Sequence, residues 1–143
     1  MPVLEYFIVA ESCSIDQISN RFSIFNVAEE GRMTVPGQIR ELFALCAWIA
    51  EPPEFGEDLQ LRLRITPPGG DMVESPHNFR MTRRRHRVAL NIRNIPITEH
   101  GELLIELLLN NDHQAFHRID ILPPDEVEAQ PPQPDDAAGA EAE

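Results

Sequence analysis

Several segments of the chain alternate apolar and polar residues, which is the pattern of a β-strand with one buried face. The clearest segment is Leu59 to Thr66, where four apolar residues alternate with four polar ones, among them Arg62 and Arg64. Residues 86–95 repeat the pattern, and residues 6–11 form a short, mostly apolar run near the start of the chain. We therefore predict a strand for each of these three segments.

The last third of the chain predicts a hairpin. Apolar residues at alternate positions within 103–109 and 115–121 flank Asn110-Asn111-Asp112-His113, and asparagine and aspartate tolerate the left-handed backbone that tight turns require. Turn-forming residues recur along the rest of the chain and leave segments of about 8 to 12 residues, a spacing typical of β-sandwiches. The pattern predicts an all-β fold, a single antiparallel β-sandwich of about seven or eight strands.

Residues 39–50 fit two structures. Their apolar positions, among them Ile39, Leu42, Cys46 and Ile49, have the spacing of a helical stripe. The same segment is apolar enough to be a buried strand. Periodicity does not decide between the two, so an α+β fold with a helix near 39–50 stays open as the alternative.

If residues 39–50 form a strand, both of its faces are apolar, and residues 103–109 share this property. Uncovered apolar faces mark interfaces. We therefore predict a homodimer or partner surface, centred on Trp48, that is formed by Phe43, Leu45, Trp48, Leu104 and Leu108. The alternatives are that the predicted loop 67–79 folds over this face, or that the segment is a buried helix.

The charged residues and the cysteines limit the reaction mechanisms and the cellular location that the chain can be expected to have. The chain of 143 residues has 24 acidic and 12 basic side chains, a formal net charge of −12. Every basic residue is an arginine, which excludes mechanisms that need a lysine, such as a Schiff base or a phosphate-loop lysine. Two cysteines without a leader-like segment predict reduced thiols and a cytoplasmic location. Because the chain has no apolar run of about 18 residues, we expect no membrane span.

The end of the chain differs in composition from the rest. Residues 125–143 hold seven acids, no base, three prolines and no aromatic residue, so they cannot bury enough apolar surface to fold. Pro123 and Pro124 precede them and end regular structure. We predict two parts, a β-sandwich domain over 1–124 and a disordered acidic tail, rich in proline and alanine, over 125–143.

The order of the motifs resembles a family of short bacterial proteins classed as a domain of unknown function. The motifs that carry the resemblance are the strand at 6–11, the segment 21–27, Pro36, the apolar run 43–48, the strand at 61–64 and the segment 101–107. The resemblance covers nearly all of residues 3–122. It implies an immunoglobulin-like or C2-like β-sandwich with a strand at 39–50, and it implies no activity.

Five arginines lie within residues 80–87. In strand geometry Arg83, Arg85 and Arg87 share one face, and Arg62 and Arg64 point outward from another strand. A ribbon of guanidinium groups on one sheet face would meet phosphates. The competing interpretation is that these arginines pair with neighbouring carboxylates, and the net charge of −12 also disfavours nucleic acid as a partner. In a third arrangement, the acidic tail lies over the arginine face.

Other candidate chemistry finds little support in the sequence. His113 and His117 are close together but lack the spacing of a zinc site, so we expect no metal. Cys13 and Cys46 lie in apolar strand contexts, where a thiol behaves as a small hydrophobe. Ser12, Cys13 and Ser14 form no nucleophile elbow. We therefore expect no catalytic residue, no cofactor and no small-molecule ligand.

Together these patterns predict a non-enzymatic binding or assembly module that acts through protein–protein contacts in a bacterial cytoplasm. A protein partner or a homo-oligomer is expected. The alternative is an anion-binding or nucleic-acid-binding protein that uses an arginine-rich sheet face formed by Arg62, Arg64, Arg83, Arg85 and Arg87.

Overall fold

Strands account for nearly all regular structure in the computed structural model, which describes residues 1–19 and 21–124. Within these residues the helical structure is a single 3₁₀ turn, η1 (Pro52–Glu54). The prediction of an all-β fold is confirmed. The predicted acidic tail at 125–143 lies outside the described residues, so the division into a domain and a tail stays a prediction.

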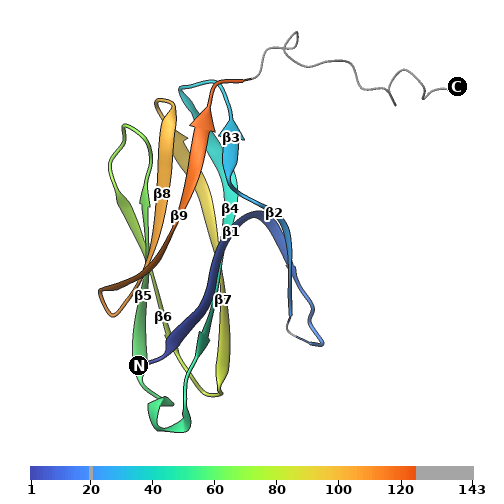
Figure 1. Cartoon of the computed structure of the whole chain (residues 1–143), viewed down its shortest axis with the longest axis vertical. Coiled ribbons are helices and arrows are strands. Elements are labelled where there is room, and N and C mark those ends of the chain that lie inside the picture. Colours follow the sequence, from blue (N-terminus) through green and yellow to red (C-terminus); the bar gives the residue numbers. More distant parts are fainter. Residues whose placement is uncertain (20, 125–143) are drawn as a thin grey trace, which may run out of the picture.

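The strands form two sheets, which lie side by side as two layers in Figure 1. In spatial order, the four-stranded sheet contains β2 (Phe22–Val27), β1 (Val3–Ile15), β4 (Gly37–Ile49) and β7 (Arg85–Ile97). The five-stranded sheet contains β3 (Glu30–Arg32), β9 (Asp112–Leu122), β8 (Gly101–Leu109), β5 (Asp58–Thr66) and β6 (Val73–Arg80). All neighbouring strands are antiparallel except β3 and β9, which are parallel.

One hydrophobic core fills the space between the sheets. Strand β5 contributes Leu59, Leu61 and Leu63 from alternate positions, while its polar residues point away from the core. Strand β8 contributes alternate residues in the same way, and β4 adds Trp48, which has no exposed surface. The Trp48 ring lies beside Phe79 of β6, with ring centroids 6.3 Å apart. The core therefore joins both sheets into one unit.

Residues 39–50 are a strand and not a helix, so the α+β alternative is wrong. Strand β4 pairs with β7 along its whole length, from Gly37 opposite Ile97 to Ile49 opposite Arg85, and it pairs with β1 on its other edge. A central strand with both faces covered is apolar almost continuously. Such a run also satisfies a helical stripe, which is why periodicity alone did not distinguish the two.

Residues 73–80 form strand β6, where the sequence predicted part of a loop. Pro76 lies within this strand, opposite Arg62 of β5. Because β6 is the edge of the five-stranded sheet, one side of its backbone has no neighbouring strand, and proline is tolerated there. Its only large core residue is Phe79, so the strand has a weak apolar signature.

The predicted terminal hairpin is confirmed. Strands β8 and β9 are joined by Asn110 and Asn111, whose φ angles are 50° and 70°. A two-residue turn with positive φ at both central residues matches the twist of the flanking strands. Asparagine accepts this conformation more readily than most residues.

The five residues of the predicted interface do not form one surface. Trp48 faces the core, whereas Leu45 is fully buried on the opposite face of β4 and is not part of the core. Leu104 and Leu108 lie on the outer side of the other sheet, since their neighbours Leu103, Ile105, Leu107 and Leu109 are the core residues. A surface centred on Trp48 is therefore wrong.

The position of Trp48 gives a testable consequence for stability. Replacing a large aromatic residue in a packed core by alanine costs about 3–5 kcal/mol. We expect Trp48→Ala to lower the free energy of unfolding by an amount in this range, measured by urea denaturation. Phe116→Ala is the matched control, because Phe116 is 52% exposed. A loss for Trp48→Ala as small as that of the control would contradict the placement of Trp48.

Candidate functional site

The five arginines of the predicted ribbon lie on two faces of the molecule. Arg62 and Arg64 belong to the outer face of the five-stranded sheet, since the core residues of β5 alternate with them. Arg85 and Arg87 lie on the outer face of the four-stranded sheet, opposite Ile49 and Ala47 of β4. The core separates these two faces, so the prediction of one arginine ribbon is wrong.

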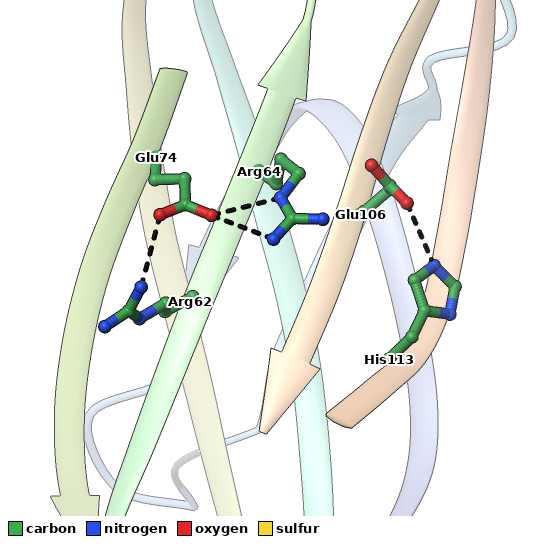
Figure 2. Close-up of polar contacts among 5 residues, drawn as sticks. All are labelled: Arg62, Arg64, Glu74, Glu106 and His113. Atoms are coloured by element: carbon green, nitrogen blue, oxygen red, sulfur yellow. Dashed lines mark hydrogen bonds and ion pairs between the residues drawn. The ribbon is translucent and has the colours of Figure 1, made fainter. Parts of the chain in front are cut away.

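On the five-stranded sheet, carboxylates neutralise the arginines. Figure 2 shows Glu74 of β6 between Arg62 and Arg64. Its two oxygens accept from Arg62 Nη1 at 3.3 Å and from Arg64 Nε at 3.0 Å. Oε2 of the neighbouring Glu106 of β8 lies 3.2 Å from Nε2 of His113 of β9. Two carboxylates thus face two guanidinium groups here, and this side of the molecule presents little net positive charge.

In the segment 80–87, three arginines lie beside carboxylates of the described residues and Arg83 does not. Arg80 forms an ion pair with Asp58, and Arg84 lies 3.7 Å from a carboxylate oxygen of Glu51. Arg85 donates to Glu5 of β1 over 2.8 Å. Arg83 is exposed and forms no ion pair with any residue in 1–19 or 21–124.

A cleft lies between the β1–β2 hairpin and the outer face of the four-stranded sheet. Figure 1 shows this hairpin standing away from the rest of the molecule. The cleft has a volume of about 380 Å³, and its apolar lining comes from Tyr6 and Ile8 of β1 and from Phe22 and Ile24 of β2. Tyr6 and Phe22 are 16 residues apart in the sequence and line the same cavity. The hairpin therefore bends.

Charged side chains line the rest of the cleft. Arg21 precedes β2, and Arg85 and Arg87 come from β7, with Glu5 as the one acidic residue of the lining. A second hollow, of about 400 Å³, is lined by Arg83, Arg85 and Arg87 together with Thr82 and His86. The two hollows share Arg85 and Arg87. We call Arg21, Arg83, Arg85 and Arg87 the arginine surface.

His86 connects this surface to the core. Its ring stacks on Phe79, with centroids 4.8 Å apart and an angle of 4° between the planes. Partial burial lowers the pKa of His86, and the nearby His77 and Arg83 lower it further. The imidazole is therefore neutral at pH 7, and protonating it would add positive charge beside Arg83.

Cys46 and two of the other histidines make structural contacts. Burial raises the pKa of Cys46 to about 12, and the indole N–H of Trp48 donates to its Sγ over 3.2 Å. His100 contacts the carbonyl of Met33 at 2.9 Å, and His117 contacts the carbonyl of Ala28. Within the described residues, no three histidine, cysteine or acidic side chains are grouped as a metal site would require.

No helix in the described part of the chain is long and apolar enough to cross a membrane. The cytoplasmic location stays a prediction.

Comparison with known proteins shows a likeness of fold to a solved structure. No protein-family model and no curated protein matches the chain. The fold is similar to part of the alkylpurine DNA glycosylase AlkC of Pseudomonas fluorescens, solved bound to DNA containing an abasic site analog, with a TM-score of 0.52 and 7% sequence identity. The match covers 85% of this chain but 30% of the glycosylase. At this identity the likeness concerns the fold alone.

This likeness contradicts the prediction of a module that acts through protein–protein contacts. The structure that resembles this chain is a DNA glycosylase solved bound to DNA and not a protein-binding module. It also goes against the expectation that the net charge disfavours nucleic acid as a partner. The expectation that the chain is not an enzyme is not tested and stays a prediction.

The sequence identified part of the arginine surface. It named Arg83, Arg85 and Arg87, but it did not connect them with Arg21 or with Tyr6 and Phe22. The alternation that places Arg85 and Arg87 outward is local, whereas their approach to Arg21 depends on how the hairpin bends. A segment with arginine next to an aromatic residue, Arg21-Phe22, was the available signal.

The lowered pKa of His86 predicts a pH dependence of stability. The unfolded chain has a histidine of ordinary pKa, about 6.5, and therefore binds a proton more readily than the folded state does. The stabilising contribution is complete above about pH 6.5 and is lost as the pH falls toward the lower pKa of the folded state. We expect the urea midpoint of the wild type to fall more between pH 7 and pH 5 than that of His86→Phe. Equal shifts would contradict this, and NMR titration of the His86 ring would give its pKa directly.

Proposed function

We propose that this domain binds nucleic acid, with DNA as the first candidate, through the arginine surface. The observation that carries the proposal is the pair of adjoining hollows that share Arg85 and Arg87. Together their linings contain four guanidinium groups and one carboxylate, that of Glu5. Guanidinium groups bind phosphate oxygens with two parallel hydrogen bonds.

The surface suits a phosphate backbone better than the arginines of the other sheet do. Arg62 and Arg64 both donate to Glu74, so a phosphate would have to displace a carboxylate already in place. On the arginine surface, Arg83 has no such carboxylate among the described residues. Local charge of this kind attracts a polyanion even to a protein whose net charge is negative.

The overall charge of −12 affects how strongly the protein is expected to bind nucleic acid and how this binding depends on salt. Long-range repulsion between the acidic protein and a polyanion opposes binding, while release of counterions by a few arginine contacts favours it. The proposal therefore predicts modest affinity that weakens with added salt.

The likeness to the DNA-bound glycosylase supports this proposal through its fold. Because the chain spans 30% of that protein, we carry over binding alone and no reaction. The proposed role is binding, and the expectation that the chain is not an enzyme is part of the proposal.

We also propose that the two packed sheets form an immunoglobulin-like or C2-like β-sandwich, and that the domain belongs to the bacterial family that its motif order resembles. In support, the sheets have four and five strands, and the chain passes repeatedly from one sheet to the other. An experimental structure with a different strand order would contradict the first part.

Two double variants separate the two arginine faces. Arg85→Ala with Arg87→Ala removes two arginines at positions i and i+2 of β7, and Arg62→Ala with Arg64→Ala removes two at the same spacing in β5. We expect the β7 variant to bind a labelled DNA oligonucleotide about 10-fold more weakly or worse, because each lost charged hydrogen bond costs about 1.5–3 kcal/mol. Its salt slope should fall by about 1 to 2 units. Fluorescence anisotropy over a series of salt concentrations measures both.

The matched variant makes the result decisive, because both variants lose the same charge. Equal weakening by the two variants would mean a nonspecific charge effect and would contradict the proposed surface, as would the absence of any binding by the wild type at low salt. Glu5→Gln provides the opposite change, since it frees Arg85 from its carboxylate. We expect Glu5→Gln to bind more tightly than the wild type.

A further inference from the structure

We infer that the cleft beneath the β1–β2 hairpin holds an unpaired base, so that the preferred ligand is single-stranded DNA. This inference rests on the proposed function and specifies the form of nucleic acid that the arginine surface takes. It depends on which side chains the fold brings together in the cleft.

The cleft combines two kinds of side chain, one that can bind the base of a nucleotide and one that can bind its phosphate. Tyr6 and Phe22 supply aromatic rings from two strands, and both side chains are partly exposed and so accessible. Arg21 lies beside Phe22, and Arg85 and Arg87 line the same cavity. A base stacks on an aromatic ring, while its phosphate binds a guanidinium group at the rim.

Duplex DNA cannot readily place a base in such a cleft. Its bases are stacked on one another, so their faces cannot reach rings that line a cavity unless a base is flipped out, which costs a few kcal/mol. In a single strand the bases are already free to leave the stack. Aromatic side chains next to basic ones are the usual surface for single-stranded nucleic acid, whereas backbone contacts to a duplex need the cations alone.

The second hollow extends the site beyond the cleft. It adjoins the cleft through Arg85 and Arg87 and adds Arg83 and Thr82. A strand whose base enters the cleft therefore finds further donors for the adjoining phosphate. Glu5 lines the cleft and accepts from Arg85 at 2.8 Å, and Arg85 lines both hollows.

The test compares a labelled 12-nucleotide single strand with a 12-base-pair duplex under the same salt conditions, using fluorescence anisotropy and the full chain. We expect the single strand to bind more tightly. Phe22→Ala should weaken single-strand binding by about 5- to 150-fold, which corresponds to the loss of one stacked base, and should weaken duplex binding less. Phe116→Ala is the control, an exposed aromatic residue on the other sheet.

A second measurement guards against misfolding of the variant. Phe22→Tyr keeps an aromatic ring and is expected to bind like the wild type, with thermal unfolding recorded for all variants. Photocrosslinking of a single strand that contains 5-iododeoxyuridine should modify Tyr6 or Phe22, as located by mass spectrometry of the peptides. Crosslinks that fall instead on Phe116 would contradict the cleft.

The outcomes separate this inference from the function on which it rests. If duplex and single strand bind equally, Phe22→Ala changes neither, and loss of Arg85 and Arg87 still weakens both, the inference is wrong and the proposed function stands. If neither ligand binds the wild type at low salt, both are wrong.

Discussion

The whole structure depends on one strand that is apolar on both faces. Strand β4 directs Leu42, Ala44 and Trp48 into the core, and it directs Leu45 and Ala47 to the other side, where they are also fully buried. Burying one face requires the second sheet. On the outer face, Leu45 and Ala47 lie among the residues of β1 and β7, the two neighbouring strands. Leu45, for example, lies between Ile8 of β1 and Ala89 of β7. The hydrophobic effect thus sets the place of the strands on both sides of β4.

The same constraint positions the candidate site. Because β4 occupies the centre of its sheet, β1 and β7 lie on either side of it. Tyr6 and Ile8 of β1 and Arg85 and Arg87 of β7 are then on one outer face, and the β1–β2 hairpin brings Phe22 and Arg21 to it. The arginines on the two outer faces consequently differ in surroundings. Arg62 and Arg64 meet Glu74 across a neighbouring strand, while the arginine surface faces a cleft with one carboxylate.

Local pattern accounts for what the sequence predicted correctly. The alternation in Leu59–Thr66 defines both the strand β5 and its buried face, and Asn110-Asn111 defines a turn, because each depends on neighbours in the chain. The errors have nonlocal causes. Whether Arg62 and Arg87 share a face depends on which sheet each strand joins. Residues 73–79 were predicted to be part of a loop, because the edge position that tolerates Pro76 is a property of the sheet and not of the local sequence. Trp48 was predicted at an interface because either face of β4 could have been the inner one.

The central claim is that the arginines of the four-stranded sheet, and not those of the five-stranded sheet, meet the nucleic acid. NMR spectra of the arginine Nε–Hε groups test it most directly, because they report on the side chains themselves during titration with a DNA oligonucleotide. The resonances of Arg21, Arg83, Arg85 and Arg87 should shift, while those of Arg62 and Arg64 should stay in place. Shifts confined to Arg62 and Arg64, or spread evenly over all 12 arginines, would contradict it.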